Sequence, residues 1–245
     1  MKLIKLNAID STNLYLKQLV ATNDCEDYTV VQAEYQEEGR GQMGTIWNSE
    51  QGKNLTFSVL LNFSSFKVHD QFYLSMAVSL AMVRVLNSTV KNSLLIKWPN
   101  DILAVNDKLA GILIENILGG NGIKKSIIGI GLNVNQVDFP KDIPNVTSLK
   151  KLTGNDYNKS ELLINIIEAI KFYVQFVEKE EFDLLKDQYL QYLYKFGIPA
   201  MFMDSSNEVF LGKIIDVNED GRLEVELENE TIRKFNLKEI KFANR

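Results

Sequence analysis

The sequence is short of the two residue types that most often build metal centres. Its 245 residues include one cysteine, Cys25, and one histidine, His69. A single cysteine cannot form a disulfide within the chain or a cysteine metal cluster, and a single histidine argues against His-based zinc sites. The chemistry of this protein is therefore expected to depend on other side chains.

Long apolar runs and an excess of basic charge are also missing. No stretch approaches the length of a membrane span, and the amino-terminal MKLIKLNAIDSTN is too polar for a signal peptide. Lys and Arg number 27 against 32 Asp and Glu, which gives a formal net charge of −5. A surface that follows phosphates needs clustered Lys and Arg. We therefore expect a cytoplasmic protein that binds neither a membrane nor nucleic acid.

The patterns that are present predict an α+β fold. Hydrophobic residues make up 45% of the chain, as is usual for a soluble globular protein. Alternating or β-branched segments predict strands, and apolar residues at helical spacing predict helices. The predicted strands are 28–34, 54–61, 94–98, 102–105, 109–117 and 126–132, with turns at Asn106-Asp107 and at 119–122; the predicted helices are 13–20, 70–86 and a helical region over 160–194.

The chain is expected to divide near residue 195. Gly197-Ile198-Pro199 breaks the helical pattern. Asp220-Gly221 then predicts a hairpin, and residues 223–228 alternate between apolar side chains and glutamate. We predict a mixed β-sheet domain with flanking helices over residues 1–195, followed by a small β-barrel-like module over residues 196–245.

Four short motifs could carry the chemistry, and the first runs from Gly39 to Trp47. Its glycines would let the backbone approach a ligand closely. Arg40 could present a planar cation to a carboxylate or phosphate, and Trp47 could stack on an adenine. The glycine spacing matches neither a phosphate loop nor a dinucleotide fingerprint. A hairpin loop with a solvated arginine remains the alternative.

The second and third motifs lie close together, at Lys97-Trp98-Pro99-Asn100-Asp101 and from Lys108 to Glu115. Asp101 could hold Mg²⁺ through its carboxylate oxygens, although an Asx turn would explain the same residues. Lys108 could neutralise an α-phosphate and the charge that develops during adenylyl transfer. The alternative for Lys108 is a solvated lysine in a hairpin.

The fourth motif runs from Gly129 to Asn135. Glycines at alternate positions leave one face of a strand without side chains, so a flat ligand could lie against the backbone. Asn133 could form a hydrogen bond with a nucleotide. A close strand crossing or a bulge would explain the glycines equally well.

In this order the motifs resemble the catalytic domain of biotin protein ligases. The resemblance covers residues 11–135 by motif, including Ser11-Thr12-Asn13 and Ala33-Glu34-Tyr35-Gln36, and its most specific part is Lys-Trp-Pro-Asn-Asp with Lys-Leu-Ala-Gly. It extends to the end of the chain by layout, because these ligases end in a small SH3-like barrel. Some relatives carry an amino-terminal DNA-binding module. Since the first motif here begins at Ser11, we expect the monofunctional type without that module.

The resemblance implies a fold like that of class II synthetases and an ATP-dependent ligase. Such an enzyme forms biotinyl-5′-AMP from biotin and ATP with Mg²⁺, and transfers biotin to a lysine of a biotin carboxyl carrier protein. A possible homodimer is also implied. By the same resemblance the catalytic residues would be Lys108 and Arg40, and Asp101 would lie near the metal. Biotin would contact Ser11, Thr12, Asn13, Gln36, Gly39, Arg40, Gly41, Gln42, Lys108, Gly111 and Gly129, and ATP would contact Trp47, Asn100 and Asn133.

This sequence departs from the family pattern at Gln42 and Thr45, where basic residues are frequent. A neutral glutamine cannot pair with phosphate as a cation, which puts the retention of the adenylate in question. Two alternatives are a lipoate ligase or octanoyl transferase of the same fold, and a non-catalytic biotin-binding protein. The Gly-Arg-Gly loop together with Lys-Trp-Pro-Asn-Asp favours biotin, and the residues of the nucleotide side would have no purpose in a pure biotin binder.

Overall fold

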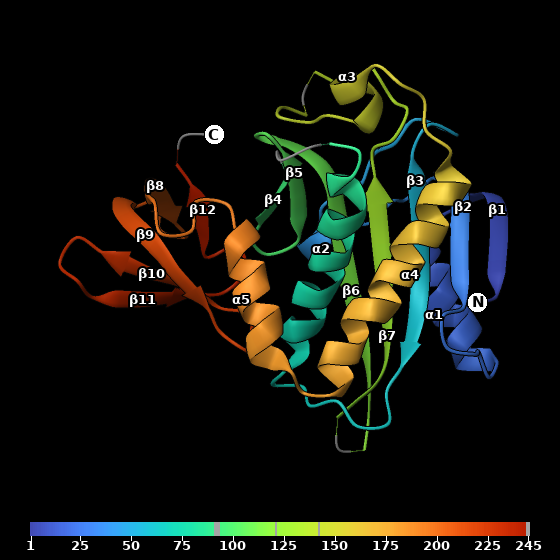
Figure 1. The fold of residues 1–245 in the computed structure, drawn as a ribbon, viewed down its shortest axis with the longest axis horizontal. Helices are drawn as coiled ribbons and strands as arrows, with labels where there is room; N and C mark the ends of the chain where they lie inside the picture. Colours follow the sequence, from blue (N-terminus) through green and yellow to red (C-terminus); the bar gives the residue numbers. More distant parts are fainter. Residues whose placement is uncertain (91–93, 121, 142, 244–245) are drawn as a thin grey trace.

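Two β-sheets organise the protein in a computed structural model that describes residues 1–90, 94–120, 122–141 and 143–243 (Figure 1). Within these residues the larger sheet has seven strands in the order β1-β2-β3-β7-β6-β5-β4. The smaller sheet has five strands in the order β11-β10-β9-β8-β12. The α+β prediction is confirmed.

The larger sheet is mixed. β1 (Leu3–Ile9) pairs in parallel with β2 (Val30–Gln36), and the other pairings described in this sheet are antiparallel. The remaining strands are β3 (Leu55–Asn62), β4 (Leu94–Lys97), β5 (Asp101–Ala104), β6 (Asp107–Gly119) and β7 (Gly122–Leu132). They confirm the predicted strands. β1 was not predicted, and the predicted turn at 119–122 includes Asn121, which lies outside the described residues.

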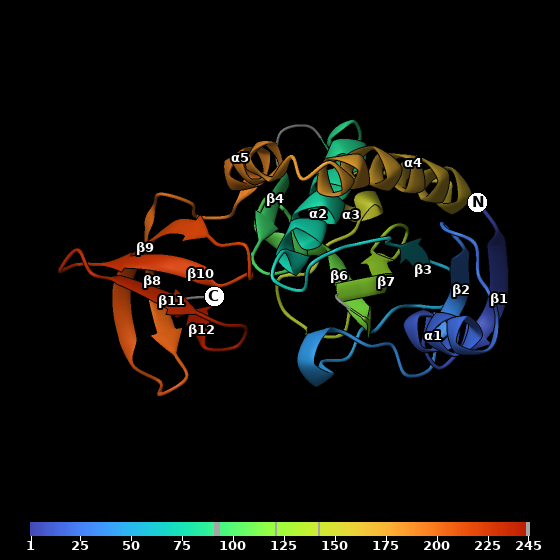
Figure 2. The ribbon, with the colours of Figure 1, turned by 90° about the horizontal axis from the view of Figure 1, so that it is seen from below.

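Helices cover the two faces of this sheet unequally. The long helices α2 (Gln71–Asn87) and α4 (Lys159–Glu178) lie on one face with α5 (Phe182–Tyr192), whereas α1 (Thr12–Thr22) lies on the other (Figure 2). Among the described helices, none combines the length and the apolar character that crossing a membrane would require. The predicted helical region 160–194 is two helices, because Glu180 between them has a φ of 55°, which an α-helix cannot accommodate.

Strand β3 separates the main core from the α1 side. Its residues Leu55, Phe57, Val59 and Leu61 belong to the large core beneath α2 and α4, as the predicted alternation requires. The intervening positions face α1, where Leu60 joins a small cluster. Thr56 and Ser58 lie on the same side and are buried although they are polar. Buried polar side chains need partners, so this face is where a site is expected.

The carboxyl-terminal strands form an open sheet. They are β8 (Pro199–Asp204), β9 (Val209–Val217), β10 (Leu223–Leu227), β11 (Ile232–Phe235) and β12 (Ile240–Phe242). The Asp220-Gly221 hairpin between β9 and β10 is confirmed. The predicted barrel is not closed: among the described residues β11 and β12 are the two edges of the sheet. The sheet is compatible with an SH3-like module, but within the described residues its edge strands β11 and β12 do not pair with each other.

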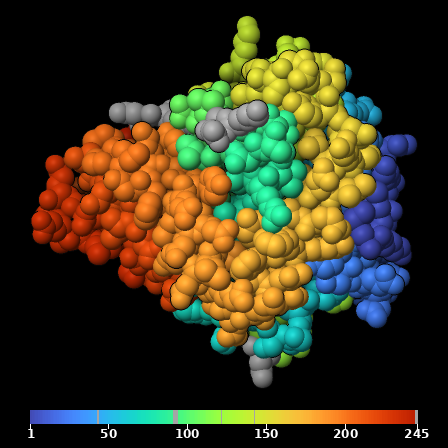
Figure 3. Space-filling model, in the orientation of Figure 1, coloured from blue at the N-terminus to red at the C-terminus, as the bar shows by residue number. Residues whose placement is uncertain are grey.

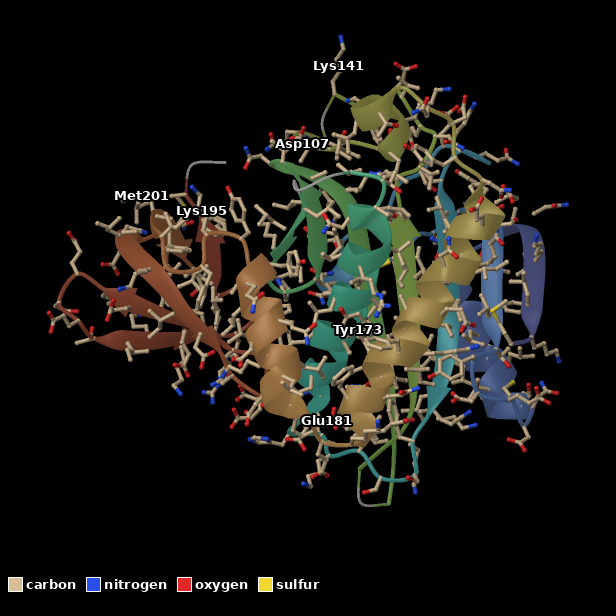
Figure 4. The ribbon with its side chains drawn as sticks, viewed as in Figure 1. Asp107, Lys141, Tyr173, Glu181, Lys195 and Met201 are labelled. Carbon is tan, nitrogen blue, oxygen red and sulfur yellow. The ribbon has the colours of Figure 1, made fainter. Side chains whose placement is uncertain are left out.

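The β9–β10 turn attaches the smaller sheet to the rest of the protein. The indole nitrogen Nε1 of Trp98 donates to the carbonyl oxygen of Gly221 at 2.9 Å. Residues of both sheets share one hydrophobic core, and in the space-filling view the carboxyl-terminal residues form a lobe packed against the larger part (Figure 3). At the ends of the larger part lie Asp107, at the beginning of β6, and Glu181, at the turn between α4 and α5 (Figure 4).

Candidate substrate-binding site

A cavity of about 250 Å³ lies on the α1 side of the larger sheet. Residues of all four sequence motifs line it, although they are far apart in the chain. Of the predicted site residues it is lined by Ser11, Thr12, Asn13, Gln36, Arg40, Gly41, Gln42, Trp47, Asn100, Asp101, Lys108, Gly111 and Gly129. The fold therefore brings together most of the residues that the sequence singled out, whereas Gly39 and Asn133 lie outside this lining.

One end of the cavity is polar and uncharged, and it is built on the beginning of α1. Ser11 is the N-cap residue, but its side chain makes no capping bond, so its hydroxyl is not occupied by the helix. The backbone N–H of Thr12 donates to Oε1 of Gln36 at 2.8 Å, and Oγ1 of Thr12 lies 3.0 Å from the same oxygen. Ser11, Thr12 and Gln36 are all buried. This end can recognise a ligand through neutral hydrogen bonds.

Two residues behind this end, Ser58 and Glu115, were not predicted from the sequence. The Ser58 hydroxyl lies 2.7 Å from Oγ1 of Thr12 and 2.6 Å from Oδ1 of Asn13. Nδ2 of Asn13 donates to Oε2 of Glu115 at 2.9 Å. The sequence could have indicated Ser58 only through its residue type, because a serine is unusual in a strand that is buried on both faces.

The other end of the cavity carries charge. Nζ of Lys108 lies 2.7 Å from Oδ1 of Asp101, in a half-buried ion pair. It also lies 5.5 Å from the centre of the Trp47 ring. Asn100 fastens the preceding turn to β6, because its Nδ2 donates to the carbonyl oxygen of Ile112 at 2.7 Å. Arg40 is exposed and lines the same cavity. Together these residues suit an anionic group.

A metal role for Asp101 stays a prediction. No group of three or more His, Cys, Asp or Glu that could hold a metal ion occurs in the part of the chain that the structure describes. Asp101 itself is paired with the Lys108 ammonium. These side chains alone do not fit a Mg²⁺ site, since Mg²⁺ is usually bound by one or two free carboxylates together with phosphate oxygens.

The loop of residues 39–47 folds back on itself. The N–H of Gly41 donates to the carbonyl of Thr45 at 2.7 Å, and the N–H of Trp47 donates to the carbonyl of Gly39 at 2.9 Å. A Cβ atom on Gly39 would collide with the carbonyl oxygen of Trp47, and one on Gly41 would collide with the Thr45 hydroxyl. Gly39 is therefore needed for the close approach of the two halves of the loop, whereas a side chain at Gly41 would require the Thr45 side chain to turn away.

The glycine slot predicted on β6 and β7 is filled by side chains of the protein itself. The indole of Trp47 lies against Gly131, where a Cβ atom would collide with the ring, and it would lie 3.2 Å from a Cβ atom on Gly111. Gly129 gives room to the Asn13 amide in the same way. The alternate glycines thus admit Trp47 and Asn13, while Gly111 and Gly129 still line the cavity.

A second cavity of about 670 Å³ adjoins the first and shares Gln36, Ile46, Trp47 and Lys108 with it. Asn133, which the sequence assigned to ATP, lines this second cavity. Its Nδ2 donates to the carbonyl oxygen of Thr147 at 3.0 Å, so it also holds the connection after β7. Trp47 and Lys108 stand between two compartments that one elongated ligand could occupy together.

The carboxyl-terminal sheet also contributes to the first cavity. Leu237 and Lys238, in the connection between β11 and β12, belong to its lining. No motif in the sequence pointed to these residues, because their place at the site depends on how the two sheets pack together. Lys238 adds a cation to the wall that Arg40 and Lys108 share.

Residues 6–133, just over half of the chain, match the biotin/lipoate A/B protein ligase family. The chain belongs to this family.

Three similar proteins make the relationship more specific. The bifunctional ligase/repressor BirA of Bacillus spizizenii is 29% identical over 236 residues, which are 95% of this chain and 71% of that protein. The biotin–[acetyl-CoA-carboxylase] ligase of Mycobacterium tuberculosis is 35% identical over 145 residues, 58% of this chain and 52% of that protein. The structure of the biotin protein ligase from Aquifex aeolicus in complex with biotin and ATP has a TM-score of 0.81 and 27% identity, and the match covers 99% of each chain.

Proposed function

We propose that this protein activates biotin with ATP and attaches it to a lysine of a biotin carboxyl carrier protein. The observation that carries this proposal is that one cavity is lined both by buried neutral polar groups, Thr12 and Gln36, and by cations, Lys108 and Arg40. Biotin has the matching chemistry, with a ureido ring at one end and a carboxylate at the other. The likeness to a ligase bound to biotin and ATP supports the same substrates.

The polar end favours biotin over lipoate. A ureido ring brings two N–H donors and one carbonyl acceptor, which would satisfy the buried groups of Thr12 and Gln36. The dithiolane ring of lipoate has no such groups, so it would make no hydrogen bond with the Thr12 hydroxyl oxygen or the Gln36 NH₂ group. A site built to hydrogen-bond its substrate discriminates strongly against an analogue that lacks the bonding atoms.

The first reaction step joins the carboxylate to the nucleotide. A carboxylate oxygen of biotin attacks the α-phosphorus of ATP, the bond from that phosphorus to the oxygen bridging to the β-phosphate breaks, and pyrophosphate leaves. Lys108 and Arg40 would bring the two anions together and stabilise the charge on the α-phosphate. Trp47, Asn100 and Asn133 would hold the nucleoside across the two adjoining cavities.

The second step transfers biotin to the carrier. The ε-amine of the carrier lysine attacks the acyl carbon of biotinyl-5′-AMP, the bond from this carbon to the phosphate oxygen breaks, and AMP leaves as the amine loses a proton. The enzyme positions the two reactants and forms no covalent bond with them. A carrier domain of a carboxylase is the proposed partner, supported by the name of the Mycobacterium relative. We also propose residues 1–195 and 196–245 as the two domains.

The test is exchange of labelled pyrophosphate into ATP by the purified protein with biotin, with lipoate and with neither acid. Exchange is expected with biotin alone. Exchange with lipoate but not with biotin would mean a lipoate ligase. Binding of biotin in a calorimeter without any exchange would mean a biotin-binding protein without catalytic activity.

A further inference from the structure

We propose that Ser58 and Glu115 determine which hydrogen-bonding groups the polar end of the cavity presents, and so make it selective for a ring that carries an N–H group beside a carbonyl. Neither residue belongs to the lining of the cavity. Both would act as positioning residues through Asn13, Thr12 and Gln36. The inference rests on the proposed function, because it concerns how that substrate is recognised.

The direction of the hydrogen bonds is set first at Glu115. A carboxylate can only accept, so the group of Asn13 that lies 2.9 Å from Oε2 of Glu115 must be its NH₂ group. The amide is planar, and its oxygen Oδ1 must then face the opposite way, toward Ser58. Gly129 leaves the space that this orientation needs, because a Cβ atom there would collide with Oδ1.

The orientation of Asn13 fixes the Ser58 hydroxyl, and Ser58 in turn fixes the hydroxyl of Thr12. Ser58 has one hydroxyl proton and lies 2.6 Å from Oδ1 of Asn13, which cannot donate, so this proton goes to Asn13. The Thr12 proton is then left with two acceptors within the protein, the Ser58 oxygen at 2.7 Å and Oε1 of Gln36 at 3.0 Å. The Ser58 oxygen is the nearer acceptor, and Oε1 of Gln36 already accepts from the Thr12 N–H, so Ser58 is the residue that holds the Thr12 proton within the protein. Thr12 therefore offers a ligand its lone pairs, as an acceptor.

Gln36, in contrast to Thr12, presents a hydrogen-bond donor. Its Oε1 accepts from the N–H of Thr12 at 2.8 Å, and so its NH₂ group must point away from α1. This group lies beside Gly39, 3.1 Å from the place that a Cβ atom would take there. The polar end thus offers an acceptor at Thr12 and a donor at Gln36. A cyclic urea, with N–H next to C=O, matches this pair.

The experiment compares Ser58→Ala with Ser126→Ala. Both serines are 0% exposed, and both are in the larger sheet, but Ser126 bonds Asn116 and takes no part in the chain of bonds to Thr12. Calorimetry would measure the affinity for biotin and for a biotin methylated on one ureido nitrogen, and pyrophosphate exchange would give the KM for ATP. Glu115→Ala, Glu115→Gln and Lys17→Ala complete the set.

Ser58→Ala is expected to weaken biotin binding by about 10- to 100-fold and to leave the KM for ATP unchanged. It should also reduce the preference for biotin over the methylated analogue, which a merely structural role would not do. Glu115→Ala should behave alike. Glu115→Gln should restore most of the affinity, because its carbonyl still accepts from Asn13. Lys17→Ala should have no effect, since Lys17 is exposed and lies 3.4 Å from the other oxygen of Glu115.

Equal biotin affinity in Ser58→Ala and Ser126→Ala would overturn the inference while leaving the proposed function intact. An equal loss of affinity for biotin and for its methylated analogue would overturn it too, because the hydrogen bonds of Ser58 would then have no part in recognising the N–H group. If the unaltered protein binds no biotin, the proposed function is wrong and the inference falls with it.

Discussion

Lys108 is paired with Asp101 at 2.7 Å, so replacing either residue leaves the other without its partner of opposite charge. Lys108→Ala is expected to slow single-turnover formation of biotinyl-AMP by roughly 10²–10³, the usual effect of removing a preorganised donor. The fold should persist, because the Lys108 side chain is 37% exposed. Lys108→Arg should restore only part of the rate, since the planar guanidinium presents its donors differently.

A paired control separates two effects of that substitution. Lys108→Ala removes a cation and also leaves the Asp101 carboxylate without its partner. The double variant Lys108→Ala/Asp101→Asn removes the cation without the unpaired anion. If the double variant recovers the wild-type rate, the repulsion from Asp101 and not the loss of Lys108 explains the defect. A folded Lys108→Ala protein with a near wild-type rate would remove Lys108 from the mechanism.

Tyr189 on α5 gives the protein a sensitivity to alkaline pH. It is fully buried, its hydroxyl has no hydrogen-bond partner within the described structure, and its burial raises the pKa of the phenol. In the unfolded chain this phenol ionises near pH 10, whereas in the folded protein it keeps its proton. The contribution of Tyr189 to stability is therefore complete below about pH 10 and is lost as the pH rises further.

Tyr189→Phe tests this directly. It keeps the ring that packs edge-on against Phe72 and removes the unpartnered hydroxyl. The variant is expected to be more stable by about 1 kcal/mol near pH 7, and to lose less stability than the wild type above about pH 10. Urea denaturation at neutral and alkaline pH measures both quantities. Parallel alkaline curves for the two proteins would contradict the prediction.

At the scale of elements, the β5–β6 hairpin carries backbone strain beside the site. The sequence predicted its turn at Asn106-Asp107, but β6 begins at Asp107 and the turn is Val105-Asn106. Val105 has a φ of 60°, a conformation that disfavours β-branched side chains, and it is exposed. Val105→Asn should stabilise the protein by about 1 kcal/mol in urea denaturation. Val105→Thr is the control: it is polar but still β-branched, so it should give no gain.

Local periodicity predicted most elements, and the missed ones lack it. The alternation in β3 and the helical apolar stripe of α2 are both long and regular, so both elements can be predicted from the sequence. Helix α3 (Leu149–Thr153) has five residues and depends on a cap, the Ser148 hydroxyl accepting from the N–H of Lys151. Whether β11 and β12 close a barrel depends on the twist of the whole sheet, and no local sequence pattern predicts this twist.

The site was predictable where the chemistry shows in the residue type. Lys108, Arg40 and Gln36 stand out as polar residues beside apolar strands, and the structure places them in one cavity. Alternate glycines show only that a strand face is open. They could not show that Trp47 and Asn13 occupy the open space. Positions supplied by packing between the sheets, such as Lys238, have no signature along the chain.

For the whole molecule, Gly221 is one point at which the smaller sheet is attached to the larger part. Its φ is 89°, and a Cβ atom would lie 2.6 Å from Cδ2 of Phe72. Gly221→Ala is expected to destabilise the protein by about 1–3 kcal/mol from the backbone alone, and by more through the contact with Phe72. Thermal denaturation measures this. Because Leu237 and Lys238 line the cavity from the same sheet, ligand binding should weaken as well.

Gly154 offers a matched control for that substitution. Its φ is 78°, close to that of Gly221, but a Cβ atom there would meet nothing within 4 Å. Gly154→Ala therefore isolates the cost of the backbone conformation. An equal loss of stability in the two variants would show that the contact with Phe72 adds nothing, and that Gly221 acts only as a turn residue.

The positions of the two tryptophans give the protein a pair of built-in fluorophores. The Trp47 indole lies between the two cavities, against Gly131, and its Nε1 is buried without a hydrogen-bond partner within the described structure. The Trp98 indole is bonded to the carbonyl of Gly221. Ligand entry would alter the emission of the first, and separation of the sheets would alter that of the second. In Trp98→Phe the remaining tryptophan emission comes from Trp47 alone, so its spectrum follows occupation of the site without an added label.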